Sequence, residues 1–239
     1  MRAIAKRHEP PELKAYRAVP GAAYDGKDFT PVKGKIRTAL LRDQLALCCY
    51  CMRRISSDAR PHPTNPDAPP VVQMKVEHWK SQTAFPSLQL AWTNMLGACL
   101  GNEGRRPADQ TCDTRKGEDA ILLNPLDPAH VSTLSCTSAG RLQSTDPRFQ
   151  KDIDDHLGLN HAVLVATRKV RLDRDLKRIL IKYRTSPIPE SAIRALVAEL
   201  ETPTETPTET PTETSTGGKL PELCSVVRLW ARKRFGAQW

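Results

Sequence analysis

Four of the seven cysteines in this 239-residue chain fall into two pairs whose spacing suits a metal site. Cys48 and Cys51 are separated by two residues, the spacing of a zinc knuckle, and Cys99 and Cys112 are separated by twelve. We expect these four thiolates to hold one structural zinc ion, because four sulfur ligands leave no open coordination position for a substrate. Cys49 is an alternative partner for Cys51, but the spacing favours Cys48. The competing interpretation is a set of unrelated buried cysteines.

Polar residues suited to phosphodiester hydrolysis lie between and after these pairs. His78 follows Glu77 at the end of an expected strand, and its ordinary pKa near neutrality suits a general base. Glu77 and Asp113 offer the hard oxygen ligands that Mg²⁺ or Mn²⁺ prefers. Asn94 is expected to fix the adjoining loop and to hold the His78 ring through a hydrogen bond. Together these residues predict a catalytic group of His78, Asn94 and Glu77, with a divalent cation bound by Glu77 and Asp113.

The segments that must position these residues can be read from apolar periodicity and proline content. Residues 33–47 show helical spacing and lead directly to Cys48, and residues 71–76 form an expected strand that ends at Glu77. Between them, five prolines predict a loop over residues 57–70. Residues 133–144 appear strand-like. A helix is expected over residues 156–183. Its apolar face would consist of Leu164, Val165, Val170, Leu172, Leu176, Ile179 and Leu180. Its basic face would consist of Arg168, Lys169, Arg171, Arg174, Lys177 and Arg178.

The two ends of the chain differ in amino-acid composition from its centre. Residues 1–32 are rich in proline and predict an extended arm on the surface, so we expect residues 1–47 to form an arm and a helix. Residues 48–124 would be the metal-bound core and residues 125–200 a helical region. The Glu-Thr-Pro-Thr repeat within residues 201–218 predicts an extended linker, because it has no core-forming residues. The basic, aromatic segment at 219–239 would be a helix or tail that docks on the body or engages a partner.

Composition limits the class of protein. Hydrophobic residues make up 39%, and 36 basic against 27 acidic residues give a net charge of +9 and a pI near 9.3. Such an excess of positive charge is compatible with polyanionic partners. The first residues lack the apolar stretch of a secretory signal, and no run of residues is long and apolar enough for a membrane span. We therefore expect a cytoplasmic protein with no membrane partner.

The order of these motifs carries a family resemblance. The series Cys-x-x-Cys, Glu-His, Trp-x-Asn-x-Leu, Cys and Cys-Asp-x-x-Lys-Gly resembles the zinc-bound HNH endonucleases of the ββα-metal type. The similarity extends over about residues 1–185 to the HNH family of Septu antiphage systems (PtuB) and retron-associated operons. It is carried by the opening Met-Arg-x-Ile-x-Lys and by these further runs: residues 33–37, 45–51, 96–103 and 157–164.

The resemblance implies a fold and a set of roles. The fold would be α+β and mainly helical, with a ββα-metal core that a zinc ion cross-links and that helices flank. His78 would be the general base, Glu77 and Asp113 the ligands of the catalytic metal, and Asn94 the residue that orients the base. Asp113 stands where the family carries His or Asn. Members of the family act on nucleic acid beside an ABC-type ATPase (PtuA-like), and in retron operons beside a reverse transcriptase with its non-coding RNA or DNA.

The leading hypothesis is therefore a metal-dependent endonuclease that cuts DNA, or RNA such as tRNA, as the effector of an antiphage system. The alternative is a non-catalytic, zinc-stabilised subunit that binds nucleic acid. We favour the enzyme, because carboxylates placed beside a phosphate site repel the phosphate unless a cation intervenes. A zinc-ribbon transcription regulator is disfavoured, since the later cysteine pair lacks the two-residue spacing. The basic face of the helix at 156–183 is either solvated or an additional phosphate contact.

Overall fold

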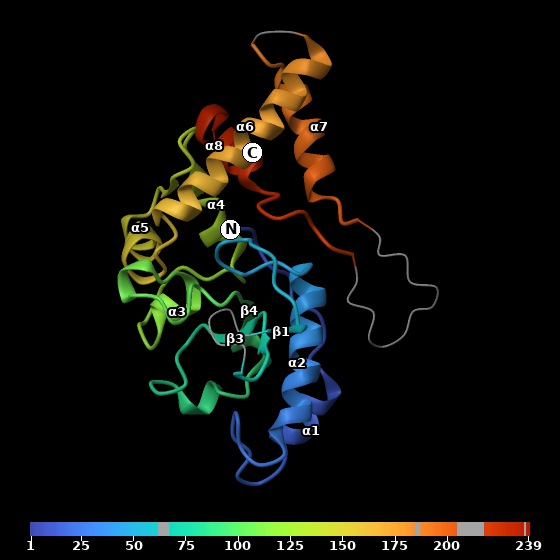
Figure 1. Ribbon diagram of the computed structural model, residues 1–239, viewed down its shortest axis with the longest axis vertical. Coiled ribbons are helices and arrows are strands. Elements are labelled where there is room, and N and C mark those ends of the chain that lie inside the picture. The colour runs from blue at the N-terminus through green and yellow to red at the C-terminus, as the bar shows by residue number, and fades with distance from the viewer. Residues whose placement is uncertain (62–66, 185–186, 205–217, 237) are drawn as a thin grey trace.

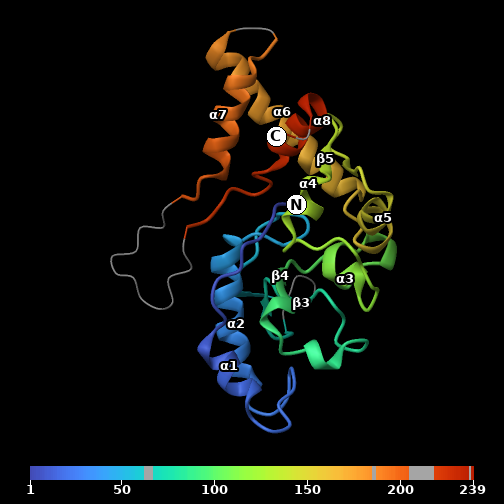
Figure 2. The same ribbon diagram turned by 180° about the vertical axis from the view of Figure 1, so that it is seen from behind.

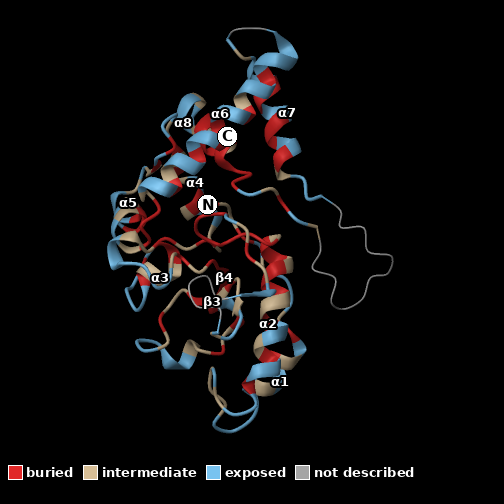
Figure 3. Ribbon diagram, viewed as in Figure 1, coloured by how far each residue is buried: buried red, intermediate tan, exposed pale blue. Residues whose placement is uncertain are grey.

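The computed structural model describes residues 1–61, 67–184, 187–204, 218–236 and 238–239. It is an α+β fold in which helices surround small antiparallel sheets of two strands each (Figure 1). Buried apolar residues of the amino-terminal, central and carboxy-terminal elements belong to one hydrophobic cluster (Figure 3). No helix in the described part of the chain has the length and apolarity to span a membrane.

The amino-terminal segment contains a helix, so the expectation of an extended surface arm over residues 1–32 is wrong. Helix α1 spans Pro11–Arg17 and packs on α2, which spans Phe29–Gln44, while Met1 and Leu13 are buried. The prolines misled the prediction because proline is well tolerated at the first position of a helix, where Pro11 stands. Helix α2 ends three residues earlier than expected, since Leu45 adopts the left-handed conformation with φ of 54°.

Two short sheets follow the helix. Strand β1 (Ala59–Arg60) pairs with β2 (Val71–Val72), and β3 (Lys75–His78) pairs with β4 (Met95–Ala98), with Glu77 opposite Leu96. The expected strand over residues 71–76 is thus two strands, broken at residues 73–74. The expected loop over 57–70 carries β1, and its residues 62–66 lie outside the described part of the chain. Between β3 and β4 run the short 3-10 helices η1 (Pro86–Leu88) and η2 (Trp92–Asn94).

The chain then builds a second group of elements around a long helix. Their bounds are η3 (Pro107–Asp109), α3 (Cys112–Lys116), α4 (Pro128–Ser132), β5 (Leu134–Cys136), β6 (Leu142–Ser144), α5 (Pro147–Lys151), the π-helix η4 (Asp152–His156), α6 (Ala162–Tyr183), α7 (Glu190–Glu201) and α8 (Val226–Phe235). The strand-like stretch over 133–144 is a hairpin of β5 and β6. Helix α6 starts later than the expected position 156, because Gly158 at φ of 56° interrupts the helical path.

The two faces of α6 differ from the predicted division. Leu164, Leu172 and Ile179 are buried as expected, whereas Val170 is 67% exposed and Leu180 43% exposed. Arg168 and Arg171, which the sequence pattern assigns to the basic face, are buried. Arg168 donates to the carbonyls of Gly140 and Leu159, at 2.7 and 2.5 Å. Arg171 pairs with Asp175 of the same helix and also donates to the carbonyl of Glu222. These two arginines anchor α6 to its neighbours and are not free to bind phosphate.

The carboxy-terminal segment packs back on the body of the protein. The linker predicted over 201–218 falls largely on residues 205–217, outside the described part of the chain. After it, α8 contacts β5 and buries Val226, Val227 and Leu229 (Figures 1 and 2). Arg228 forms an ion pair with Glu201 at 2.7 Å. Of the two interpretations of this segment, docking on the same chain is therefore confirmed.

Candidate metal centre and active site

The four cysteines chosen from the sequence lie together. The sulfur atoms of Cys48, Cys51, Cys99 and Cys112 are all within 4.8 Å of one another, and all four residues are buried. The Sγ atoms of Cys51 and Cys99 are 3.7 Å apart. A tetrahedral zinc ion with Zn–S bonds of about 2.3 Å requires sulfurs about 3.8 Å apart. The cluster can therefore hold a metal ion such as zinc, and the thiol that completes it with Cys51, Cys99 and Cys112 is that of Cys48 and not that of Cys49.

Backbone hydrogen bonds bring the cysteine pairs to one point. The Cys48–Cys51 turn closes through the Met52 amide, which donates to the Cys48 carbonyl at 3.1 Å. The Cys49 amide donates to the carbonyl of Gly97 in β4, so the turn is attached to the strand that leads into Cys99. Cys112 begins α3, and its amide donates to the carbonyl of Leu157. A metal ion here would cross-link the turn, the β3–β4 hairpin and α3.

The charges of the cluster also fit a cation. Burial opposes ionisation of Cys48, but hydrogen bonds from Cys112 and the other neighbouring thiols place its pKa well below the ordinary value. The hydrogen bond to Cys48 and those to Cys51 and Cys99 raise the pKa of Cys112 well above the ordinary value. Without a cation, the lowered pKa of Cys48 and the raised pKa values of Cys51 and Cys112 make Cys48 the one of these three that ionises most readily. A divalent ion would stabilise all four as thiolates.

Glu77 lies at the centre of the polar site. Its side chain is 1% exposed, accepts a hydrogen bond from the Tyr50 hydroxyl at 2.7 Å and pairs with Lys116 Nζ at 3.0 Å. Burial raises the pKa of Glu77 well above its ordinary value, and a hydrogen bond with Asp113 raises it further against the opposing charge of Lys116. Two carboxyl groups that interact in this way repel each other when both are ionised, and a divalent cation between them would relieve that repulsion.

Asp113 provides the accessible side of this carboxyl pair. It lies in the first turn of α3, directly after Cys112, and its side chain is 19% exposed. Lys75 Nζ is 3.9 Å from Asp113 Oδ2 and 2.9 Å from Glu103 Oε1. Mg²⁺ usually binds one or two protein carboxylates together with water and substrate phosphates. Glu77 and Asp113 therefore offer oxygen donors of the type that Mg²⁺ or Mn²⁺ prefers, while Glu77 is already paired with Lys116.

His78 is held in one tautomer by a backbone carbonyl. Its Nε2 lies 2.9 Å from the carbonyl oxygen of Gln89, so Nε2 must carry the proton that is donated. In the neutral ring, Nδ1 is then the atom that can accept a proton. Burial lowers the pKa of His78 below the ordinary value of 6.5, and the ring packs edge to face on Tyr24 with centroids 4.5 Å apart. His78 is thus neutral at pH 7.

Asn94 fixes the loop between β3 and β4, although it does not hold the His78 ring as predicted. Its Oδ1 accepts from the amide of Lys80 at 2.8 Å, and its Nδ2 donates to the carbonyls of Lys80 and Leu88 at 2.9 and 3.2 Å. Leu88 immediately precedes Gln89, whose carbonyl holds His78. Asn94 therefore acts on His78 indirectly, by fixing the backbone that orients it.

The sequence analysis did not identify four residues of this site, namely Tyr24, Tyr50, Gln89 and Lys116. Tyr50 and Lys116 stand inside the quoted cysteine motifs, so their position next to metal ligands was an available signal. Gln89 acts through its backbone carbonyl, which no side-chain pattern reveals. Tyr24 belongs to the misjudged amino-terminal segment, and its amide donates to Gln89 Oε1 at 3.0 Å. This segment covers His78, which is 5% exposed.

The comparisons with known proteins add no family to this geometry. A scan against protein-family models gives no match, and a search of curated proteins gives none either.

Proposed function

We propose that this protein is a metal-dependent HNH endonuclease that hydrolyses phosphodiester bonds. The observation that supports this function most strongly is the interaction of Glu77 with Asp113 beside the four-cysteine cluster, with His78 next to Glu77 at the end of β3. A base, a pair of carboxyl groups and a rigid frame are what hydrolysis of a phosphodiester requires from a protein. The order hairpin then helix, in β3, β4 and α3, is the order expected of a ββα-metal core.

Glu77 and Asp113 would hold a divalent cation. When bound, such a cation polarises the scissile phosphate and stabilises the charge that develops on it. Lys116 Nζ contacts Oε1 of Glu77 and so orients the carboxyl group, which also interacts with Asp113. Tyr50 restrains the same carboxyl group through its hydroxyl.

His78 would act as the general base. Its Nδ1 accepts the proton of the attacking water, while Nε2–H stays bonded to the Gln89 carbonyl and holds the ring in place. That carbonyl also favours the imidazolium that forms, because it accepts a hydrogen bond from it. The lowered pKa of His78 keeps the base unprotonated at neutral pH.

The wider role rests on the sequence resemblance. We propose DNA as the favoured substrate, with RNA such as tRNA as the second choice, and a cytoplasmic effector function in antiphage defence. An ABC-type ATPase partner, and in a retron setting a reverse transcriptase with its nucleic acid, would belong to the same proposal. The net charge of +9 supports a polyanionic substrate.

The test is a cleavage assay of the purified zinc-loaded protein on plasmid, single-stranded DNA and tRNA with Mg²⁺ or Mn²⁺. The His78→Ala variant should lose cutting and keep its zinc content and its folding. His8→Ala is the matched control, because His8 is exposed, and it should cut like the wild type.

One observation favours the alternative of a non-catalytic binding subunit, namely the burial of Glu77 and His78 at 1% and 5% exposure. The same assay with the neighbouring ATPase added separates the two functions. Cutting that requires the ATPase and His78 supports a gated nuclease. Nucleic-acid binding without any cutting under both conditions would establish the binding subunit.

A further inference from the structure

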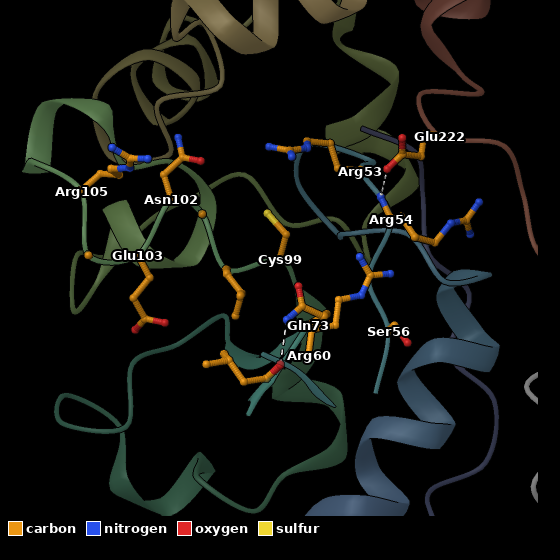
Figure 4. A pocket seen from close by; sticks show the side chains of 14 residues that line it. Arg53, Arg54, Ser56, Arg60, Gln73, Cys99, Asn102, Glu103, Arg105 and Glu222 are labelled. Atoms are coloured by element: carbon orange, nitrogen blue, oxygen red, sulfur yellow. Dashed lines mark hydrogen bonds between the residues drawn. The ribbon is translucent and has the colours of Figure 1, made fainter. Parts of the chain in front are cut away.

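A cavity of about 620 Å³ lies beside the cysteine cluster and is not part of the carboxyl site. Cys99 lies in its wall, and the remaining lining comes from the turn after Cys51, from β1 and β2, and from the loop that follows Cys99. Four arginines and two glutamates line it, and they are Arg53, Arg54, Arg60, Arg105, Glu103 and Glu222 (Figure 4). The lining contains no aromatic residue among the described positions.

The charged residues of this cavity divide into those used by the fold and those left free. Arg54 donates to the carbonyls of Leu45, Ala46 and Leu220, and Glu222 accepts from the Arg54 amide. Glu103 is paired with Lys75. Both carboxylates and one guanidinium are therefore already engaged.

Three guanidinium groups remain. Arg53, Arg60 and Arg105 are exposed residues, and their side chains have no hydrogen bond or ion pair within the described part of the chain. Arg105 stands on one side of the cavity, and Arg53 and Arg60 stand on the other (Figure 4). A strand of phosphates passing between them would contact both sides. Guanidinium groups bind phosphate oxygens with paired hydrogen bonds, which makes this arrangement well suited to such a ligand.

The cavity adjoins the carboxyl pair through one side chain. Lys75 Nζ reaches Glu103 at the cavity wall and lies 3.9 Å from Asp113 in the carboxyl site. A polyanion seated between the three arginines would therefore run toward Asp113. The absence of aromatic residues from the described lining removes the surfaces on which bases stack, so phosphate contact is the main interaction available.

We propose that this cavity binds backbone phosphates of the nucleic-acid strand next to the bond that is cut, without reading its bases. This inference rests on the proposed nuclease function and adds the site that positions its substrate.

The test measures how the affinity for a fluorescein-labelled oligonucleotide depends on salt, by fluorescence anisotropy between roughly 50 and 200 mM KCl. All proteins carry His78→Ala so that the probe stays intact. The variant under test adds Arg53→Gln, Arg60→Gln and Arg105→Gln. The control instead adds three substitutions of exposed arginines outside the cavity, with the same loss of charge: Arg106→Gln, Arg148→Gln and Arg234→Gln.

The cavity variant should bind more weakly, with a smaller slope of log affinity against log salt. Each lost phosphate contact lowers that slope by about 0.9 for duplex DNA and about 0.7 for a single strand, so a total loss of about 2–3 is expected. The control should keep most of the slope, and probes of different base sequence should bind alike. Zinc content and circular dichroism should match among all the proteins.

An equal slope in the cavity variant and its parent would overturn the proposal, as would an equal loss in the control. Titration with ADP separates a second source of phosphate. Binding of ADP that needs the three arginines, with an unchanged oligonucleotide slope, would assign the cavity to a free nucleotide and refute the proposal. Failure of the nuclease function is a different result: the parent chain with His78 would not cut, while the cavity variant would still lose its slope.

Discussion

Removal of one cysteine from the cluster should cost much of the stability of this protein. In the substitution Cys112→Ala, the fourth ligand of the proposed zinc ion is lost. A cross-link between Cys51 and Cys99, which are 48 positions apart, lowers the entropy of the unfolded chain by the equivalent of about 4 kcal/mol. The shorter link from Cys99 to Cys112 adds about 3 kcal/mol. Loss of the ion therefore removes about 7 kcal/mol, against a typical free energy of unfolding of about 5–15 kcal/mol.

The assay combines the zinc content of the purified protein, by mass spectrometry, with urea unfolding followed by circular dichroism. The wild type should carry one zinc per chain, and Cys112→Ala should carry much less and be partly unfolded without denaturant. Cys49→Ala is the matched control, because Cys49 is buried next to Cys48 but lies outside the cluster. It should keep one zinc and most of the stability.

Two results would refute this reasoning. The first is a Cys112→Ala protein with one zinc per chain and a free energy of unfolding within about 1 kcal/mol of the wild type, far from the loss expected of a broken cross-link. Alternatively, Cys49→Ala would lose its zinc, which would mean that the neighbouring thiol is the true ligand.

Three further predictions concern the polar site. Lys116→Met should lower the free energy of unfolding by about 1–3 kcal/mol in urea, because the buried carboxyl group of Glu77 loses its ion-pair partner and, with a pKa already raised by burial, takes up a proton instead. The double variant with Glu77→Gln should recover part of that loss, and a double variant no more stable than Lys116→Met would contradict the pairing. Asn94→Ala should lower the free energy of unfolding by about 2–4 kcal/mol in urea, since it leaves the backbone groups of Lys80 and Leu88 without their partners. It should also lower kcat, and an unchanged kcat would show that the loop does not orient His78. Because the base must be unprotonated and burial lowers the pKa of His78, the acid limb of kcat/KM should have its midpoint below pH 6.5. A midpoint above pH 6.5 would rule out a buried neutral His78 as the base.

The sequence alone was sufficient wherever the signal is local. The two-residue spacing of Cys48 and Cys51 reflects the geometry of a single turn, and the Glu77–His78 pair ends a strand, β3, in a stretch whose β-branched residues favour one. The four cysteines chosen from the sequence do lie together, because spacing within a turn limits which sulfurs can face one point. The division of the chain into five segments and the assignment to the HNH class stay predictions.

Several features were decided by tertiary structure. The burial of Arg168 depends on carbonyl groups of Gly140 and Leu159, which come from a hairpin and a loop rather than from α6 itself. A helical periodicity pattern treats every arginine as solvated, since it contains no information about distant acceptors. The same limit explains the misjudged amino-terminal segment, whose prolines begin a helix that packs on α2.

For the site too, some features follow from the sequence and others only from the folded structure. Residue types and spacing determined that thiolates, two carboxyl groups and an imidazole are present in the order of a metal-bound hairpin and helix. Only the folded chain brought Cys112 to Cys48, placed Lys116 against Glu77, and set the Gln89 carbonyl at 2.9 Å from His78. The physical reason is that ligand identity is a property of side chains, whereas protonation and tautomer depend on burial and on neighbours that are remote in the sequence.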